Sequence, residues 1–253
     1  MAKSMQIGSV ARALALLDCL AQSGGPLPLK ELSSRMGMPK STLHGLLSTM
    51  REYRVVAQDE YGRYRLGAHL LELSSAIIRQ SDVVGIAKPL LQSISREVEE
   101  SACVCVLDGD YVLVLDSVAA MNPMRVMTDA GMRLPLHASA PGKAILAKLP
   151  EDEALRLIRL CGLAAYTPHT ITDIKAIVAE RLHIQEMGYA IDNGELRVGM
   201  RAVAAAISGP DGKYSYAIAV TGMFRKITDE TFQTAQALVV EAAQTISKRI
   251  SGE

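Results

Sequence analysis

Tryptophan is absent from this 253-residue chain, and aromatic residues of all kinds make up only 4% of it. Proteins that bind RNA or single-stranded DNA usually stack the bases on aromatic side chains, so this scarcity argues against both classes. No apolar run reaches the roughly 20 residues that a helix needs to span a bilayer. The first residues lack the apolar core of a signal peptide, so we expect a cytoplasmic protein with no membrane partner.

Cysteine and histidine are also few, with four and five residues, and neither has the spacing of a metal site. The cysteines, Cys19, Cys103, Cys105 and Cys161, fit no zinc finger or ribbon, and the histidines form no HExxH motif. Cys103 and Cys105 are expected to alternate along a strand, to share one face and to be small buried residues. We therefore expect no metal and no cofactor.

What the chain does contain suits a folded protein of two domains. Hydrophobic residues make up 49% and charged residues 21% of the sequence, enough to bury a core. The net charge is zero, but the first 65 residues hold nine Lys and Arg against five Asp and Glu, so they carry +4 and the remainder −4. An excess of this size also arises by chance, yet a basic segment on an acidic body is typical of a protein that contacts phosphates.

The hydrophobic spacing of the first 66 residues predicts a winged helix-turn-helix. Ser9 is expected to cap a first helix, and Leu29–Met36 has the spacing of a second. Gly37 suits a left-handed turn, and Pro39 is expected to open a third helix at its first turn. A hairpin is predicted over Val55–Leu66. This order of elements is typical of a winged helix that binds DNA.

Beyond residue 67 the pattern predicts a linker helix and then an α+β domain with one antiparallel sheet. The expected elements are the linker helix 67–80, a helix at about 89–100, strands 103–107, 112–117 and 124–128, helices 138–147, 151–159 and 174–187, strands 189–192, 201–208 and 214–221, and a closing helix 229–250. The last two strands are expected to be joined by a turn at 209–212. The predicted domains are 1–67, 68–81 and 82–253.

Residues 26–53 are predicted to form the helix-turn-helix that reads double-stranded DNA. The amino-terminal end of the third helix carries Lys40, Ser41, Thr42 and His44, which can hydrogen-bond base edges or phosphates in the major groove. The alternative is that Ser41 and Thr42 merely cap a helix in a small α-helical protein. Contacts to the phosphate backbone are expected from five arginines: Arg12, Arg51, Arg54, Arg63 and Arg65.

Six stretches of the chain share their order and spacing with one known family. They are Val10–Leu17, Leu29–Leu32, Gly37–His44, Tyr64–Gly67, Leu134–Ala144 and Gly188–Asp192. Each stretch alone has little specificity for a family, but all six in this order and spacing are highly specific. The chain resembles the IclR family of transcription regulators along nearly its whole length. The resemblance implies a winged helix head, a linker helix, a GAF-like effector domain, and homodimers, often paired as dimers of dimers, on palindromic promoter sites.

One departure from the family lies in the recognition helix. The family usually has Arg after the recognition-helix His, whereas Gly45 follows His44 here. Glycine inside a helix costs about 1 kcal/mol relative to alanine, and this one also lacks a side chain for DNA. We therefore expect an operator sequence that differs from those of the relatives.

The resemblance also implies a small-molecule pocket in the carboxyl-terminal domain. Carried over by position, its residues are Val126, Leu134, Ala140, Pro141, Asp192, Ala202, Ala219 and Thr221. Asp192 is expected to accept hydrogen bonds from a ligand hydroxyl or hydrated carbonyl, and Thr221 to donate one to a carboxylate. Pro141 has no N–H, Ala202 stands where the family often has Cys, and Ala219 stands where a relative can have Ser, so a pocket that is less polar or shaped for a different ligand is expected. Cys103 is a further candidate to face it.

Two arginines, Arg125 and Arg201, are alternative clamps for a ligand carboxylate, although an ion pair with a neighbouring acid is the expected role of each. The favoured function is a ligand-responsive DNA-binding regulator, a repressor of a catabolic operon, whose effector is a small organic or aromatic acid. Two alternatives stay open. One is an enzyme built on such residues as Cys103 and His137, although no nucleophile elbow or phosphate loop supports it. The other is a metabolite-binding module whose head binds protein.

Overall fold

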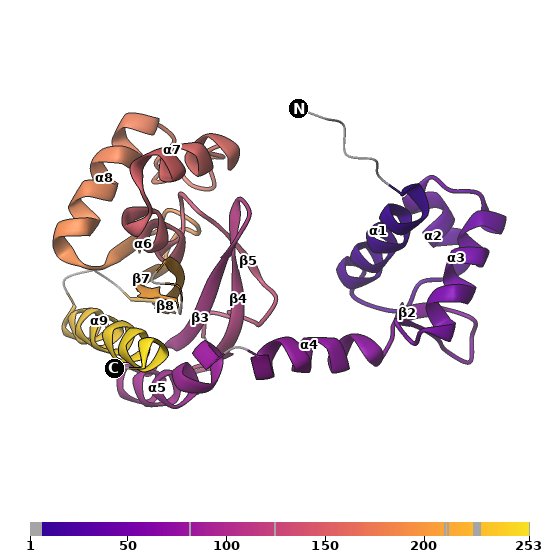
Figure 1. The fold of residues 1–253 in the computed structure, drawn as a ribbon, viewed down its shortest axis with the longest axis horizontal. Coiled ribbons are helices and arrows are strands. Elements are labelled where there is room, and N and C mark those ends of the chain that lie inside the picture. Colours follow the sequence, from indigo (N-terminus) through magenta and orange to yellow (C-terminus); the bar gives the residue numbers. More distant parts are fainter. Residues whose placement is uncertain are drawn as a thin grey trace. The chain divides into compact units, whose positions relative to one another are not determined.

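The computed structural model describes residues 7–80, 82–123, 125–209, 211, 213–224 and 229–252. The chain forms two compact units, Met1–Gln80 and Ser81–Glu253 (Figure 1). Each unit has its own hydrophobic core, so each is described by itself. The finer division into domains 1–67, 68–81 and 82–253 stays a prediction.

The first unit is a winged helix-turn-helix followed by a helix. Its described elements are α1 (Gly8–Gln22), α2 (Leu29–Met36), α3 (Lys40–Glu52), β1 (Val56–Gln58), β2 (Tyr64–Leu66) and α4 (His69–Gln80). Leu16, Leu32, Leu43 and Leu47 are fully buried where the first three helices meet. These leucines occupy one face of each helix, which is the spacing that the sequence shows.

Turns in this unit follow from a few residues. Gly37 ends α2 with a φ of 60°, a left-handed conformation that glycine adopts without strain. Gly67 is required by space, because a Cβ there would lie 2.1 Å from the carbonyl oxygen of Arg54. The backbone that leaves β2 at Gly67 therefore lies directly against the backbone of Arg54, just before the hairpin. The predicted cap at Ser9 is wrong, since α1 begins at Gly8 and Ile7 precedes it without a side-chain cap.

The second unit is built on one antiparallel sheet of six described strands in the order β5-β4-β3-β8-β7-β6. The strands are β3 (Ser101–Asp108), β4 (Tyr111–Val118), β5 (Arg133–Pro135), β6 (Ala190–Asn193), β7 (Arg201–Ser208) and β8 (Tyr214–Gly222). The helices are α5 (Asp82–Val98), α6 (Ala140–Lys148), α7 (Glu151–Leu160), α8 (Ile174–Met187) and α9 (Glu230–Ser251). The predicted α+β class with an antiparallel sheet is confirmed.

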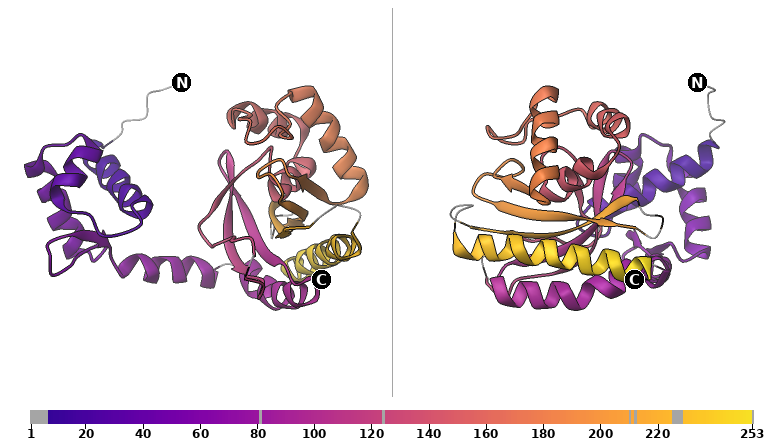
Figure 2. Two further views of the ribbon diagram at one scale, coloured as in Figure 1. Left: turned by 180° about the vertical axis from the view of Figure 1, so that it is seen from behind. Right: turned by 60° about the vertical axis from the view of Figure 1, so that its left-hand side comes forward.

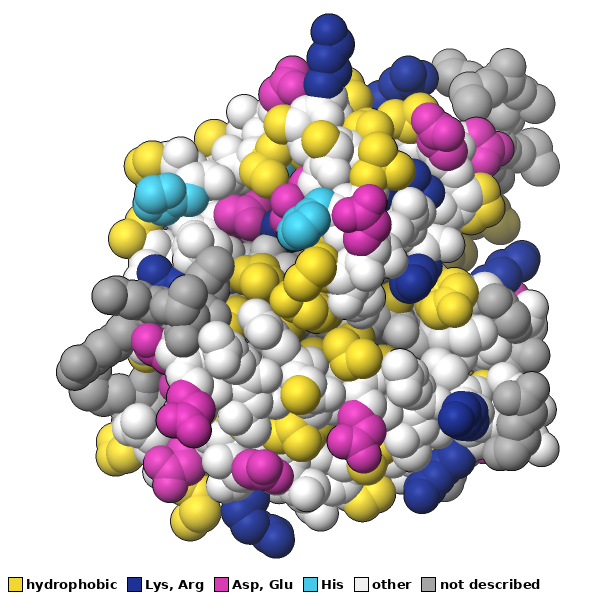
Figure 3. Space-filling view, turned by 90° about the vertical axis from the view of Figure 1, so that its left-hand side faces the viewer, with side chains coloured by type: hydrophobic (Ala, Val, Ile, Leu, Met, Phe, Trp, Pro, Cys, Tyr) yellow, Lys and Arg dark blue, Asp and Glu magenta, His cyan; other side chains and the backbone are white. Residues whose placement is uncertain are grey.

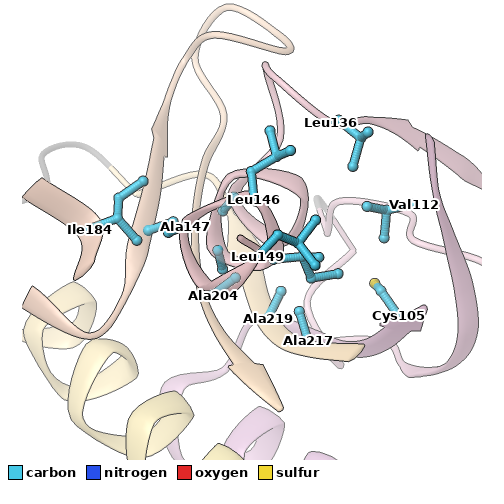
Figure 4. Packing of buried hydrophobic residues seen from close by; sticks show 14 of the residues in the cluster. Cys105, Val112, Leu136, Leu146, Ala147, Leu149, Ile184, Ala204, Ala217 and Ala219 are labelled. Carbon is cyan, nitrogen blue, oxygen red and sulfur yellow. The ribbon is translucent and has the colours of Figure 1, made fainter. Parts of the chain in front are cut away.

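Helices cover both faces of this sheet. The helices α5 and α9 pack on one face, and α6, α7 and α8 lie on the other (Figures 1 and 2). Successive residues of β3 point to opposite faces, so Ala102 and Val104 join the α5–α9 core, whereas Cys103 and Cys105 join the α6 core. The predicted shared face of the two cysteines is therefore confirmed. Alanines of β7 and β8 line the same face and let α6 approach closely (Figure 4).

One predicted helix and one predicted strand differ clearly from the structure. The helix predicted at 89–100 begins earlier, at Asp82, and contains Pro89 in its interior. Proline there removes a hydrogen bond to the carbonyl of Gly85, which is tolerable where tertiary packing holds the helix. The predicted strand 124–128 is absent over its described part, 125–128, and Met124 lies outside the described residues. Ser81, Pro210 and Gly212, which the predicted linker boundary and turn include, also lie outside them.

Candidate functional site

The amino-terminal end of α3 presents polar side chains to solvent. Leu43 and Leu47 turn inward and are fully buried, which directs the opposite side of the helix outward. The exposed side chains there, called the reading edge below, are those of Lys40, Ser41, Thr42 and His44. Pro39 precedes the helix without a side-chain cap, so its first N–H groups stay available to an anion such as phosphate.

The predicted phosphate-contacting arginines are all exposed, but they differ in what holds them. Arg51 lies in the last turn of α3 and is exposed. The Nε atom of Arg12 donates to the Gly8 carbonyl at 2.9 Å. Arg63 is more constrained, because its Nε lies 2.8 Å from Asp59 Oδ2, so a phosphate would have to displace or share this ion pair. These differences rank Arg51 above Arg63 as a phosphate contact.

A pocket in the second unit, called the α6 pocket below, lies where α6 begins against the strands of the sheet. Its volume is about 50 Å³. The structure brings together all eight residues predicted to bind ligand: Val126, Leu134, Ala140, Pro141, Asp192, Ala202, Ala219 and Thr221. The lining also includes eight others: Cys103, Met127, Thr128, Met132, Ser139, Leu196, Arg197 and Met200. That these residues bind an effector stays a prediction.

The start of α6 is held rigidly beside this pocket. Ser139 caps the helix, since its Oγ accepts a hydrogen bond from the Gly142 N–H at 3.2 Å and donates one to the Pro135 carbonyl at 2.6 Å. Gly142 is needed for the close approach, because a Cβ there would lie 2.4 Å from the Leu136 carbonyl oxygen. The backbone at the pocket wall is thus fixed before any ligand arrives.

Asp192 on β6 is the buried acid of the pocket, with 5% of its surface exposed. Its Oδ1 accepts hydrogen bonds from the N–H groups of Glu195 and Leu196 at 2.6 and 3.3 Å. Burial raises the pKa of Asp192 above its usual value, and the two N–H donors oppose this shift. One carboxylate oxygen therefore shapes the loop after β6, and Oδ2 is the atom left to meet a ligand.

A buried charge cluster lies directly behind Asp192, and the sequence analysis missed it. Lys143 of α6 is 3% exposed, and its Nζ donates to Glu195 Oε1 at 2.5 Å and to Glu180 Oε1 at 3.1 Å. Burial raises the pKa of Glu195, and the charge of Lys143 opposes the rise. No motif links these residues, which are 37 and 52 positions from the lysine, so only the fold reveals them.

The outer side of this cluster opens to a second hollow of about 390 Å³, which Glu180, Glu195, His169 and His183 help to line. Figure 3 looks onto the α8 side of the unit and shows histidine and acidic side chains gathered beside exposed hydrophobic ones. Within the part of the chain that the structure describes, no group of three or more His, Cys, Asp or Glu could hold a metal ion. The hollow is thus no metal centre of that kind.

The two arginines proposed as carboxylate clamps are not part of the α6 pocket. Arg201 donates from Nε to Asn193 Oδ1 at 2.7 Å and from Nη1 to the Phe224 carbonyl at 2.5 Å, so the expected ion pair with an acid is wrong for it. Arg125 is exposed. The arginine that does line the pocket is Arg197, which follows Asp192 in the next loop and is exposed. No periodic pattern in the sequence predicts this position.

No helix in the described ranges is long and apolar enough to cross a membrane.

Comparisons with known proteins identify both units. The sequence profile of the IclR helix-turn-helix domain matches residues 9–60, and that of the bacterial transcriptional regulator IclR C-terminal domain matches residues 75–248. The transcriptional repressor IclR of Escherichia coli strain K12 is 33% identical over 250 residues, which cover 98% of this chain and 91% of that protein. Both matched profiles are those of transcription regulators, and one is a helix-turn-helix domain, so the chain is a DNA-binding regulator of transcription rather than an enzyme.

Solved structures give the same answer. An IclR transcriptional regulator from Alicyclobacillus acidocaldarius matches with a TM-score of 0.84 and 29% identity, over 96% of this chain and 98% of that chain. An IclR homologue from Microbacterium hydrocarbonoxydans, solved in complex with 4-hydroxybenzoate, shares the fold with a TM-score of 0.81 at 22% identity, over 97% of this chain and 100% of that chain. This chain belongs to the IclR family of transcription regulators.

Proposed function

We propose that this protein represses a catabolic operon and that a small carboxylate bound in the α6 pocket controls the repression. The observation that carries the proposal is that all eight residues carried over from the family resemblance line one pocket. Asp192 Oδ2 and the Arg197 guanidinium supply one acceptor and one cation to a lining that is otherwise mostly apolar and includes the hydroxyls of Thr128, Ser139 and Thr221. The reading edge of α3 and Arg51 supply the contacts to double-stranded promoter DNA.

The size of the α6 pocket favours a compact effector. Its volume is only about 50 Å³, and methionines at 127, 132 and 200 are the lining side chains most able to move and enlarge it. The Microbacterium hydrocarbonoxydans homologue was solved with an aromatic acid. A short-chain oxo or hydroxy acid therefore requires these methionines to shift less than an aromatic acid does.

A fragment of DNA from upstream of neighbouring genes is expected to shift in a gel with the protein and to be released by a short-chain 2-oxo acid such as pyruvate or glyoxylate. Release requires that the acid bind the DNA-free arrangement better than the DNA-bound one. In Asp192→Asn, the amide oxygen can still hold the loop, but the charge facing the ligand is lost. DNA binding is expected to persist and the release to disappear.

Thr170→Ala serves as the control. The Thr170 hydroxyl donates a hydrogen bond to the Glu195 carbonyl, so it contacts the same loop as Asp192, but Thr170 does not line the α6 pocket. Release that survives in Asp192→Asn would refute the role of Asp192. Failure of the wild-type protein to bind any upstream fragment would refute the proposal that it represses those genes.

We also propose that the first unit pairs with a second copy. Ile7, which directly precedes α1, and Val10 and Leu14 within it follow one another at helical spacing and are 66%, 53% and 59% exposed. On α4, Leu73 and Ile77 are 48% and 63% exposed, one turn apart. Exposed apolar residues at helical spacing are typical of surfaces that another chain covers, and a dimer would present two reading edges to a palindromic site.

Leu14→Glu is expected to shift the protein from dimer towards monomer, because it places a charge within the apolar face without touching the core. Sedimentation velocity at micromolar concentration measures the shift. Ser9→Glu is the matched control, since Ser9 is exposed on the opposite side of α1. An unchanged sedimentation coefficient in Leu14→Glu would place the dimer contact elsewhere.

A further inference from the structure

Two buried thiols lie side by side at the α6 pocket. The Sγ atoms of Cys103 and Cys105 are 3.7 Å apart, and the two residues are 2% and 0% exposed. Cys103 lines the pocket, and Cys105 lies deeper, among the buried residues around α6 (Figure 4). Both are free cysteines. The pocket therefore has a pair of thiols in its wall.

The neighbouring strand shows that packing alone does not require sulfur at these positions. Cys103 pairs with Ala219 and Cys105 with Ala217 of β8, and these alanines face the same core under α6. A small side chain is enough to let α6 approach the sheet at those positions. The two sulfurs thus add a chemical property to a surface that alanine otherwise builds.

The distance between the sulfurs indicates what can join them. A disulfide bond is about 2.05 Å long, and alternate residues of a strand lie about 6.6 Å apart at Cα, near the upper limit for a disulfide. Two sulfurs bonded at about 2.3 Å to one trivalent atom, whose lone pair keeps the angle between the bonds near 95°, lie about 3.4 Å apart. The observed 3.7 Å is the contact distance of two unbonded sulfurs, and a small rotation of the thiols brings them to the separation at which one atom can bridge both.

Few soft atoms are satisfied by two sulfurs at this angle. Zinc requires two further protein ligands, and no such group exists among the residues described. Trivalent arsenic bearing one organic group needs only two more bonds, and sulfur is the donor that soft centres prefer. We propose that Cys103 and Cys105 form a dithiol site that captures a monoalkyl trivalent arsenical, with the alkyl group in the α6 pocket.

The capture is a substitution at arsenic. In methylarsonous acid, each of the two As–O bonds is replaced by an As–S bond, and each hydroxyl group leaves as water with the proton of one thiol. Arsenic stays trivalent, so no oxidant takes part. The hydrogen bond with Cys103 and burial raise the pKa of Cys105, which keeps its thiolate scarce. Alkylating agents need that thiolate, whereas here the thiol proton departs with the hydroxyl group.

The test incubates the reduced full-length protein with methylarsonous acid and an excess of glutathione, which removes arsenic held by a single thiol. Intact-mass spectrometry is expected to find one methylarsenic group per chain, with two hydrogens lost, and dithiothreitol is expected to remove it. The adduct is expected to be lost in Cys103→Ala and in Cys105→Ala. Cys161→Ala is the matched control and is expected to keep it.

Circular dichroism melting verifies that the alanine variants fold, and Cys103→Ser and Cys105→Ser repeat the test if one does not. Absence of an adduct in the wild-type protein overturns the proposal. An adduct that survives in both single variants, or that requires Cys161, overturns it as well. The readout is a mass and does not depend on DNA binding, so its failure is distinguishable from failure of the proposed regulatory function.

Discussion

A Ser41→Ala, Thr42→Ala double variant is expected to bind its operator roughly 30-fold more weakly than the wild-type protein. Both side chains lie exposed on the reading edge, and loss of hydrogen bonds to base edges costs about 1–3 kcal/mol for each good contact. A total loss near 2 kcal/mol gives about this factor. Fluorescence anisotropy with a labelled upstream fragment, at fixed salt concentration, measures it.

Specific and non-specific binding can be separated in the same experiment. Removing base contacts is expected to leave the affinity for random duplex DNA unchanged, because that affinity comes from phosphate neutralisation. Lys40→Ala, in contrast, is expected to weaken both and to reduce the slope of log affinity against log salt by about one if Lys40 contacts phosphate. Ser48→Ala, an exposed serine two turns from the start of α3, is the control. Equal operator affinity of double variant and wild type would mean that another surface reads the DNA.

The elements of the first unit were predictable because their signals are local. The buried leucines of α1 to α3 repeat every three or four residues, and Gly37 and Pro39 stand at the turn before α3. Such signals need only neighbouring residues and the geometry of a helix. The sequence does not predict which partner an exposed charged side chain contacts. The ion pair between Arg63 and Asp59 is visible only once the hairpin brings them together.

The segment predicted as a strand at 124–128 shows why alternation can mislead. Val126 and Thr128 are 7% and 8% exposed, whereas Met127 between them is 50% exposed, which is the pattern of a strand. The backbone, however, makes no strand pairing there, and the Val126 carbonyl accepts a hydrogen bond from Ser101 Oγ at 2.8 Å. Val126 and Thr128 are buried against the α6 pocket rather than within a sheet. Burial by a pocket and burial by a sheet leave the same signature in a sequence.

The pocket residues could be anticipated through the family resemblance but not from local pattern. Ala202 and Ala219 resemble ordinary core residues, and only the strand register sets Ala219 beside Cys103 and Ala202 beside Thr221. The sequence analysis missed Arg197 and the Lys143 cluster, because the first lies in a loop and the second depends on contacts between distant elements. Long-range charge pairing leaves no periodicity to detect.

Lys143→Met is expected to lower the melting temperature of the protein by about 10 °C at neutral pH. Methionine fills a similar volume but leaves the carboxylates of Glu195 and Glu180 without their cation, and breaking a buried pair in this way costs about 3–5 kcal/mol. In a domain of about this size, each kcal/mol lowers the melting temperature by about 2–4 °C. Differential scanning calorimetry measures it, with Lys175→Met, an exposed lysine of α8, as the control.

The loss of stability in Lys143→Met, measured as a function of pH, tests whether unpaired charge causes it. Burial already raises the pKa of Glu195 in the folded protein, and removing Lys143 takes away the charge that opposes the rise. A carboxyl group whose folded pKa is raised holds its proton more tightly when folded, so the free energy of unfolding falls as pH rises from the usual glutamate pKa through the folded one. The deficit of Lys143→Met is therefore expected to be small near pH 4.5 and to grow towards pH 8. A deficit of equal size at both pH values would mean that lost packing, rather than unpaired charge, destabilises the variant, and that the cluster does not fix α6 electrostatically behind Asp192.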